Sequence, residues 1–511
     1  MMPPTKLVTA VGRPATAEGG VLRRLRGRRA AEPRELEVTV QSLPRWVWLV
    51  FGVLAGLGLM TVNGSLTAFA ILELPLFFLL LWRRGEPPAL LFVCFFQWLQ
   101  ASVAIFYTDF YGLSLKYASS DEFIEATWLS LFGVLVLAAG MRLGMRGMKK
   151  SSGVEADAAA QTLSIPKLFN GYLVSFVALS GLRAVAHALP GLSQALLVAL
   201  NFKWIIVILL MFAIIRQRRQ YGLLGLVLLM ESVLGVLGYF SHFKSVYFVL
   251  GVVLLASPVA FRPGKIFAVS AVLVFSLSLA VVWSVIKSDY REYLNQGTGE
   301  QVVLVSVGER LDKLQELAGE LDGEKMQKGI EALVLRVTYV QFFALSLANV
   351  PQNLPHENGK LWLGAVEHVF MPRLFFPNKA AIDDSVRTSY YTGMTVAGAE
   401  QGTSIGIGYM GESYIDFGRK LMFLPVILLG FFSGWLYRGL VRWAVHPLLG
   451  MVVATTILMF NNFTIEQSNI KLFGGLVISL LVLGACMRMF GRHFWKLVIR
   501  PALGKPSVAA R

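Results

Sequence analysis

Hydrophobic residues along this chain gather in long runs, and most of the polar residues fall between the runs. A membrane-spanning helix needs roughly 20 consecutive apolar residues, and about 12 runs reach that length. The predicted spans begin near Trp46, Leu66, Ala89, Ile124, Leu168, Leu192, Tyr221, Val246, Ile266, Leu421, Trp443 and Leu472. The pattern therefore predicts an all-α polytopic integral membrane protein with about 12 transmembrane helices.

The stretch 287–420 interrupts the apolar pattern because it is rich in Arg, Tyr and Gly. We expect one large, partly helical loop there. The chain then divides into a basic N-terminal tail (1–45), transmembrane helices 1–9 (46–286), the loop (287–420), transmembrane helices 10–12 (421–489) and a basic C-terminal tail (490–511). The N-terminal tail has Pro, Gly and a basic run without apolar residues in series, a composition typical of disorder, and no cleavable signal peptide is expected.

Clusters of Lys and Arg occur in every second gap between the predicted spans. They are RRLRGRR before the first span, WRRGEPP, MRLGMRGMKK, RQRRQ, FRPGK and YRGLVRW in alternate gaps, and MRMFGRHFWKLVIR at the end. Cytoplasmic segments of membrane proteins carry an excess of positive charge. This rule predicts that both termini are cytoplasmic and that the large loop lies on the outer side.

Two segments of the loop have helical periodicity. Residues 307–321 alternate as an amphipathic helix should, with Glu309 and Lys313 four positions apart. Residues 332–350 are apolar enough to resemble a further span. A single extra crossing would move the basic C-terminal clusters outside, and a compensating crossing would carry Glu412 and Asp416 into the membrane at a cost of roughly 2.5 to 3.5 kcal/mol each. We therefore expect a helix that packs on, or dips into, the outer face.

Composition supports the membrane class and removes other classes. Hydrophobic residues make up 55% of the chain and charged residues only 15%, which excludes an ordinary soluble globular protein. The formal net charge of +16 is explained by the cytoplasmic clusters, so no nucleic-acid partner is expected and the bilayer is the first partner. The two cysteines, Cys94 and Cys486, lie in apolar runs, so neither a disulfide framework nor a thiolate metal site is predicted.

Several common reaction types lack their sequence motifs. The chain has no GxxxxGK[ST] phosphate loop, no GxGxxG, no HExxH and no DxD pair. Nucleotide hydrolysis, dinucleotide redox chemistry, zinc proteolysis and metal-dependent sugar-nucleotide transfer all lose support. We therefore expect no cofactor and no metal.

Basic residues accumulate where a membrane protein normally has few, on the predicted outer side. Arg and Lys hold phosphate oxygens well and can stabilise a diphosphate leaving group without a metal. The candidate anion-binding residues are Arg183, Lys244, Arg291, Arg336, Arg373, Lys379 and Arg387, with Arg419 close by. Structural roles compete with this interpretation: Arg183 or Lys203 can pair with Glu231, and Arg291 stands beside Asp289 and Glu292.

Two further strings complete the candidate site. MPRLFFPNKA (Met371 to Ala380) is followed by TSIGIGYMGESYIDFGRK (Thr403 to Lys420), and neither is expected of a span or a simple linker. Together they resemble Wzy-type oligosaccharide repeat-unit polymerases of bacterial surface polysaccharide synthesis. The matching residues are Pro372, Arg373, Pro377, Lys379, Gly411, Glu412, Tyr414, Phe417 and Gly418. The close resemblance covers about fifty residues, and lipid-A-core ligases share the general layout.

The resemblance implies an O-antigen polymerase-ligase architecture, similar to GT-C glycosyltransferases, in the bacterial inner membrane with the loop in the periplasm. It implies metal-independent transfer of a glycan from undecaprenyl diphosphate, with a flippase and a chain-length regulator as further partners. The basic residues would then hold the diphosphates, and Glu412, His368 or His242 would be the general base. Trp362, Tyr390, Tyr391 and Tyr414 would contact sugars, and Gly406, Gly408 and Gly411 would let the backbone approach the glycan.

Three alternatives remain open from the sequence. An O-antigen-type ligase would use the same donor and a similar Arg-rich loop. A transporter of lipid-linked glycans would normally place polar residues in broken helices at the membrane midplane. A scaffold of an export complex would need none of the loop arginines for synthesis.

Overall fold

The computed structural model describes residues 43–118, 120–148, 152–189, 191–237, 243–256, 263–298, 303–371, 375–376, 378–379, 382–398, 403–461 and 463–500. Within these ranges the regular structure is helical, with one isolated bridge between Leu163 and Ile499 and no strand. This confirms the all-α class at the level of a helical membrane protein. Arg373, His242 and most of the two terminal tails lie outside the described residues, so the predictions made for them are not addressed by the structure.

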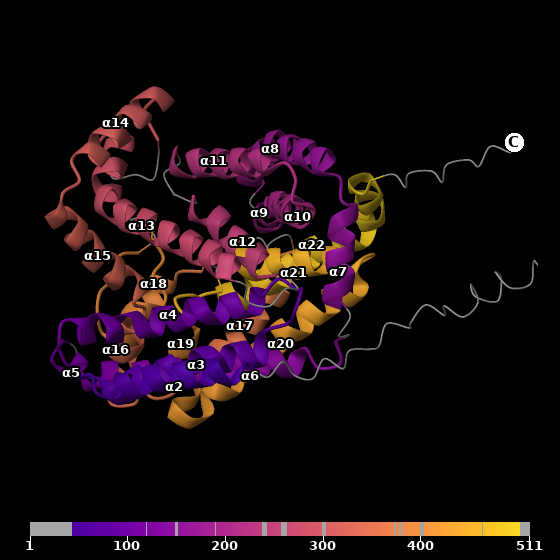
Figure 1. Ribbon diagram of the computed structural model, residues 1–511. Coiled ribbons are helices and arrows are strands. Elements are labelled where there is room, and N and C mark those ends of the chain that lie inside the picture. Colours follow the sequence, from indigo (N-terminus) through magenta and orange to yellow (C-terminus); the bar gives the residue numbers. More distant parts are fainter. Residues whose placement is uncertain are drawn as a thin grey trace, which may run out of the picture. The chain divides into compact units, whose positions relative to one another are not determined.

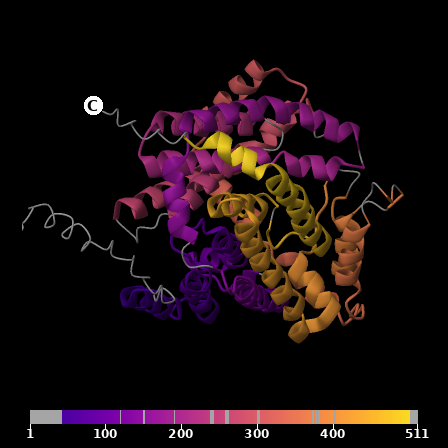
Figure 2. The same cartoon turned by 90° about the vertical axis from the view of Figure 1, so that its right-hand side faces the viewer.

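The helices before the loop are α2 (Arg45–Gly58), α3 (Gly64–Leu81), α4 (Ala89–Phe110), α5 (Leu115–Ala118), α6 (Asp121–Gly144), α7 (Ser152–Thr162), α8 (Ile165–Ala188), α9 (Ser193–Ala199), α10 (Phe202–Gln217), α11 (Tyr221–Leu237), α12 (Lys244–Leu255) and α13 (Pro263–Leu294). The loop contains α14 (Val307–Gly319), α15 (Gly323–Val337), α16 (Gln341–Asn349), α17 (Lys360–Phe370), α18 (Asp384–Thr392) and α19 (Tyr409–Leu421). The chain then continues through α20 (Phe423–Trp443), α21 (Pro447–Phe460) and α22 (Asn469–Val498), the orange to yellow helices of Figures 1 and 2.

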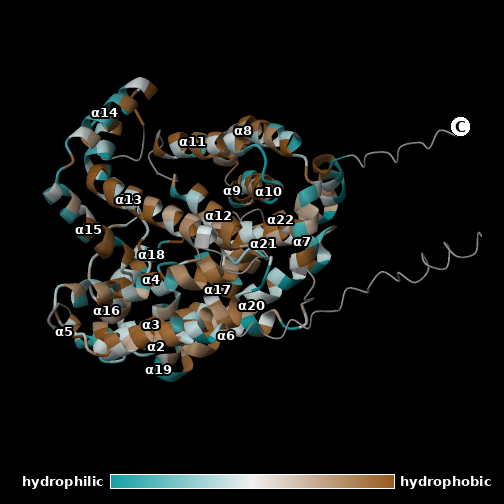
Figure 3. Ribbon diagram, in the orientation of Figure 1, coloured by the Kyte–Doolittle hydropathy of each residue, from teal (hydrophilic) through white to brown (hydrophobic). Residues whose placement is uncertain are grey.

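Seven described helical segments are long and apolar enough to cross a membrane. They are α3, α4, α6, α9 with α10, α13 from Phe267, α20 and α22. Five of the predicted spans are shorter apolar helices in α2, α8, α11, α12 and α21, so the count of about 12 stays a prediction. Figure 3 shows the contrast between the mostly hydrophobic span helices and the mixed surface of α14.

Segments with the same predicted side of the membrane contact one another. Gln217 at the end of α10 donates a hydrogen bond to the Leu163 carbonyl (2.8 Å), and Leu163 forms the isolated bridge to Ile499. Tyr437 of α20 donates to Glu86, just before α4 (3.3 Å). All five residues lie beside predicted cytoplasmic clusters, so the described contacts are consistent with the alternating topology.

Two glycine pairs bring α6 and α20 into close backbone contact. A Cβ atom at Gly140 would lie 2.3 Å from the Ile427 carbonyl oxygen, and one at Gly434 would lie 2.1 Å from that of Met141. Gly144 and Gly430 meet the opposite backbone at 2.2 and 2.3 Å in the same way. Both helices therefore carry a Gly-x-x-x-Gly pattern at the crossing, which permits dense helix packing in a membrane.

Non-helical backbone from the segment between α21 and α22 reaches the middle of α4. Gln97 accepts a hydrogen bond from the Tyr409 hydroxyl (2.6 Å) and donates to the Phe463 carbonyl (3.3 Å). The side-chain oxygen of Gln100 accepts from the Ile465 backbone N–H (2.9 Å). Irregular backbone is stable at membrane depth only where protein partners satisfy its polar groups. Gln97 and Gln100 provide these hydrogen-bond partners, so α4 supports the polar site.

The segment 332–350 is not one helix. It is divided between α15 and α16, which meet at 48° after a break at 338–340. The Tyr339 N–H donates to the Gln100 carbonyl of α4 (3.2 Å) instead of continuing the helix, and Phe342 and Phe343 are buried. The expectation of a continuous helix was wrong because contacts with α4 and burial of the α16 face outweigh local helical periodicity.

The predicted amphipathic helix over 307–321 is confirmed as α14, which ends at Gly319. Ser306 and Glu309 form a reciprocal capping box at its start, which satisfies two backbone N–H groups. Lys313 pairs with Glu316 (2.6 Å) rather than with Glu309. The helix is present as predicted, but the ion pair of Lys313 is with a different carboxylate.

Candidate functional site

Four cations from three helices converge near one end of the polar loop, and we call them the basic cluster. Lys244 begins α12, Lys287 and Arg291 lie one turn apart on α13, and Arg336 is in the last turn of α15. The charges of Lys287 and Arg336 act on Lys244, and those of Arg291 and Arg336 act on Lys287. Since like charges repel at this range, the arrangement suits an anionic ligand.

The members of the basic cluster differ in their counter-charges. Glu466, from the segment between α21 and α22, pairs with Arg336 at 3.0 Å. Among the residues that the structure describes, no carboxylate lies within ion-pair distance of Lys244 or Lys287. Partly buried cations without counter-charges are costly. An anion that contacts several of them would remove that cost.

A cleft of about 450 Å³ lies between the end of α13 and α14. Three of its side chains are carboxylates, from Asp289, Glu292 and Glu309, and Lys313 is its one cation. The helical spacing of 100° per residue places Asp289 and Glu292 away from Lys287 on α13. The two sides of the helix therefore differ in charge, and an anion is directed to the basic cluster rather than to the cleft.

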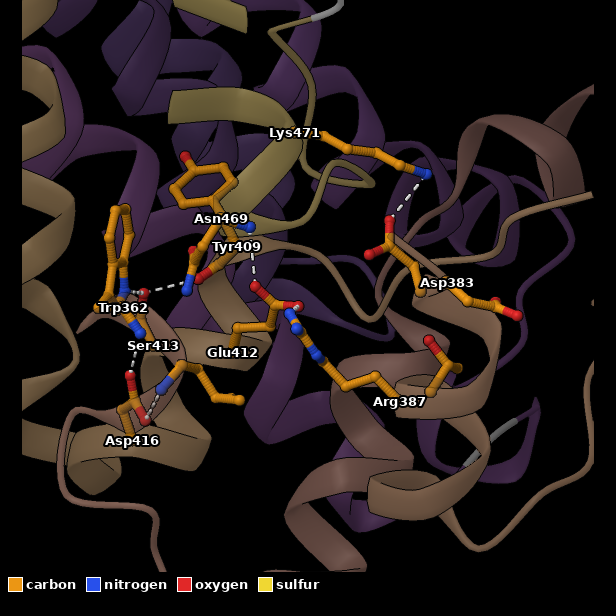
Figure 4. A network of polar contacts seen from close by, with 12 residues as sticks. Trp362, Asp383, Arg387, Tyr409, Glu412, Ser413, Asp416, Asn469 and Lys471 are labelled. Atoms are coloured by element: carbon orange, nitrogen blue, oxygen red, sulfur yellow. Dashed lines mark hydrogen bonds and ion pairs between the residues drawn. The ribbon is translucent and has the colours of Figure 1, made fainter. Parts of the chain in front are cut away.

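A second group of charges, the ion-pair network, joins α18, α19 and α22 (Figure 4). Arg387 Nη1 of α18 donates to Glu412 Oε1 of α19 at 2.9 Å. Glu412 Oε2 accepts the backbone N–H of Asn469, the first residue of α22, at 2.7 Å. The carboxylate thus sits at the positive end of the α22 helix dipole, where negative charge is stabilised.

Asp384 and Lys471 complete the ion-pair network. Lys471 Nζ lies 2.8 Å from Asp384 Oδ2 and donates to Ser404 Oγ at 2.7 Å. Asp384 is on α18, one turn before Arg387, and its charge also acts on Arg387 and Glu412. The four charged groups therefore form one connected unit across the start of α22.

Tyr339 connects the basic cluster with the ion-pair network. Its hydroxyl donates to the Gly406 carbonyl at 2.7 Å, and the charges of Glu466, Arg336 and Asp384 all act on its phenol. The break between α15 and α16 places Tyr339 there, so the feature that ends α15 also joins the two groups of charges.

Burial shapes the proton affinity of the ion-pair network. Burial raises the pKa of Glu412 above its ordinary value, and Arg387 and the Asn469 N–H offset only part of that rise. Burial also opposes the charge of Arg387, but the Glu412 carboxylate raises the pKa of the guanidinium above its ordinary range. The pair is held together because each charge compensates the burial of the other.

The Gly-Glu-Ser-Tyr motif of α19 makes internal contacts. Ser413 accepts a hydrogen bond from the Trp362 indole (2.9 Å), and the Tyr414 hydroxyl donates to the Val350 carbonyl (2.6 Å). Asp416 accepts the Trp362 backbone N–H (2.8 Å) at the start of α17. Burial raises the pKa of Asp416, with these N–H groups acting in the opposite direction. The motif therefore docks α19 against its neighbours.

Glycines in this region allow other parts of the protein to come close. Gly408 has φ of 97°, and a Cβ there would lie 2.2 Å from the Ile465 carbonyl oxygen. Gly418 has φ of 70° and faces the His356 ring, and it forms a kink inside α19. These two positions require glycine because side chains strain a left-handed backbone. The predicted approach of Gly408 to a glycan stays a prediction, and in the structure its close neighbour is the Ile465 backbone.

The structure brings together five of the residues predicted from the sequence: Lys244, Arg291, Arg336, Arg387 and Glu412. The basic cluster holds the first three, and the ion-pair network holds the last two. Tyr339 lies within range of charges from both groups, because Arg336 and Asp384 both act on its phenol. This juxtaposition comes from α12, α13, α15, α18 and α19, which are distant in sequence.

Other predicted residues have different surroundings. Lys379 donates to the backbone carbonyls of His368 and Met371, so it contacts the end of α17, where His368 lies. Tyr414 is fully buried, and its assignment as a substrate contact stays a prediction. Arg419 pairs with Glu125 at the start of α6 (2.9 Å).

Three predicted residues lack a described side chain. Arg373 and His242 lie outside the described residues, and Arg183 is on α8 with its side chain outside them. Their assignments stay predictions. The alternative pairing of Lys203 with Glu231 is confirmed at 2.8 Å, and Tyr172 donates to the same carboxylate.

The aromatic candidates differ in how far their side chains are exposed. Tyr390 is 58% exposed and keeps a ring face available for a sugar. Tyr391 is buried and its hydroxyl donates to Glu357 (3.0 Å), while Trp362 is half-buried against Ser413. Only Tyr390 of the four has the exposure that stacking requires.

Sequence reasoning missed Lys287, Asp384, Glu466 and Lys471. Lys287 stands four positions before Arg291, a spacing that places both on one helix face, and this signal was present in the sequence. The other three carried no comparable signal, because their partners come from other elements. No protein-family model, curated protein or solved structure matches the chain.

Proposed function

We propose that this protein is a metal-independent glycosyltransferase that polymerises oligosaccharide repeat units carried on polyprenyl diphosphate, at the outer face of the bacterial inner membrane. The convergence of Lys244, Lys287, Arg291 and Arg336 carries the proposal, because such a cluster suits a diphosphate. A lipid-linked substrate also fits a polar site supported by the middle of a span helix.

In the proposed reaction a hydroxyl of the acceptor glycan attacks the anomeric carbon of the donor glycan. The new glycosidic bond forms as the bond between the anomeric carbon and the diphosphate oxygen breaks. Lys287 and Arg336 offset the charge that develops on the departing diphosphate. The hydroxyl proton passes to a base. Glu412 was predicted for this role, but its two oxygens are held by Arg387 and the Asn469 N–H.

The first test replaces cations of the basic cluster. Lys287→Ala and Arg336→Ala should each lower polymer synthesis by roughly 10²- to 10³-fold, as loss of one charge-stabilising donor does in other enzymes. Each variant is expressed in a deletion strain, and the length distribution of lipid-linked glycans is measured. Lys328→Ala is the control, since Lys328 forms only an exposed pair with Glu324 on α15.

Accumulation of single repeat units on the lipid carrier is the expected result. Long chains retained on the carrier would point instead to a ligase, because that reaction acts after polymerisation. Normal polymer from both variants, with normal protein levels, would remove the proposed diphosphate site. Repeat units that stay on the cytoplasmic leaflet would identify a transporter.

A further inference from the structure

In the ion-pair network the carboxylates are buried and the cations face outward. The Glu412 and Asp384 side chains are 1% and 2% exposed, whereas those of Arg387 and Lys471 are 25% and 32% exposed. Two ordinary surface ion pairs would expose both partners to a similar degree. Here each carboxylate lies behind the cation that it holds.

The donors of the two cations are only partly used. Glu412 engages one terminal nitrogen of the Arg387 guanidinium, which has five N–H donors in a fixed fork. Lys471 contacts the buried Asp384 and the exposed Ser404, which together use two of its three N–H donors. Both cations therefore retain donors for an anion that arrives from the exposed side.

The Glu412 carboxylate, in contrast, is oriented inward. One oxygen holds Arg387 and the other accepts the N–H of Asn469, and the residue is 1% exposed. A general base must reach the hydroxyl whose proton it removes, at hydrogen-bond distance or through one water. The neighbouring cations stand between this carboxylate and the exposed side.

We infer that Glu412 and Asp384 are positioning residues, and that the cations they hold, Arg387 and Lys471, form an anion-binding pair that contacts a phosphate group of the substrate. The inference rests on the proposed function for the identity of that substrate. It assigns a role to Lys471 and replaces the role of Glu412 as base. The two carboxylates fix the cations on α18 and α22, so that the cations need not be ordered when the substrate binds.

A double-mutant cycle separates positioning from proton transfer. Glu412→Gln, Arg387→Ala and the double variant are assayed in membranes of the deletion strain, with lipid-linked repeat units extracted from that strain as substrate. Positioning predicts that Glu412→Gln raises KM roughly 10- to 100-fold, the value of one hydrogen bond to a charged group. It also predicts that the double variant is no worse than Arg387→Ala alone.

A base predicts a different pattern. Glu412→Gln would then lower kcat by roughly 10² to 10⁴ with little change in KM, and the loss would persist in the Arg387→Ala background. That result would overturn the inference for Glu412. If Glu412→Gln does not fold, Asp384→Asn, Lys471→Ala and their double variant provide the corresponding comparison for the second carboxylate and cation.

A binding measurement keeps this inference separate from the proposed function. Undecaprenyl diphosphate is added to the detergent-solubilised protein and the thermal midpoint is recorded, with Lys328→Ala as the control variant. The ligand should stabilise the wild type, and roughly 10- to 100-fold more should be needed for Lys471→Ala or Arg387→Ala. Equal stabilisation of all variants would overturn the anion-binding pair. Stabilisation that is lost in both variants would support the pair even if the deletion strain still makes long polymer, so the two proposals fail separately.

Discussion

At the scale of single residues, Glu412 shows how burial changes the meaning of a charged side chain. In the sequence it is a carboxylate in a polar string, and a catalytic role is the natural interpretation. In the fold its carboxylate is buried and accepts hydrogen bonds from Arg387 and the Asn469 backbone, and the charge of Asp384 acts on it. A carboxylate in such a place is stable only with its partners, so its main effect is on their positions.

The raised pKa of Glu412 predicts a pH dependence of stability. The folded chain binds this proton more tightly than the unfolded chain. The resulting contribution to the free energy of unfolding is fully present below the ordinary value of 4.5 and is lost as pH rises through the folded pKa. The difference in thermal midpoint between wild type and Glu412→Gln should therefore shift against the wild type as pH rises.

The measurement is thermal unfolding in detergent across a pH series. Glu324→Gln is the matched control, since it removes an exposed carboxylate whose side chain is 77% accessible. A difference that moves in favour of the wild type with rising pH would show that Arg387 and the helix dipole outweigh burial.

At the scale of elements, packing determines where helices meet and where they stop. α19 is short and polar, yet it is almost fully buried because its polar side chains reach α17, α18 and α22. α6 and α20 show the apolar counterpart, where four glycines remove the side chains between two backbones. The first arrangement places the loop helix α19 against the span helix α22, and the second packs two span helices together.

The α6–α20 crossing can be tested with one methyl group. Gly434→Ala places a Cβ 2.1 Å from the Met141 carbonyl oxygen, so the helices must separate. We expect a loss of about 1 to 3 kcal/mol in unfolding free energy, the usual cost of overpacking. Gly225→Ala on α11 is the control, because no atom lies within 4 Å of its added Cβ. Equal thermal midpoints for the two variants would contradict the close crossing.

At the scale of the whole molecule, the predicted topology makes the polar site an outer site. The contacts between predicted inner segments are consistent with it. A substrate on the outer leaflet would then meet the basic cluster directly.

Cysteine labelling tests this orientation. Single cysteines replace Lys328 on α15 or Arg219 in the turn before α11, both exposed, in a Cys486→Ala background; native Cys94 is buried. An impermeant thiol reagent should label the Lys328→Cys protein in intact spheroplasts and the Arg219→Cys protein only after permeabilisation. The reverse pattern would place the polar loop in the cytoplasm and remove the proposed reaction from the outer leaflet.

The amino-acid sequence by itself determined the membrane class and the positions of the apolar helices, and it pointed to Arg336, Arg387 and Glu412 as residues of interest. These features follow from composition and local periodicity, because burial in lipid requires apolar runs of sufficient length. The capping of α14 by Ser306 was equally local.

Only the tertiary structure decided how the charges are used. The break between α15 and α16, the pairing of Asp384 with Lys471, and the inward orientation of Glu412 all depend on partners far away in sequence. Short-range patterns contain no information on which buried group will meet which donor, since that is set by the simultaneous packing of several helices. The sequence therefore identified the polar loop, and the fold decided which of its charged groups are buried and which are exposed.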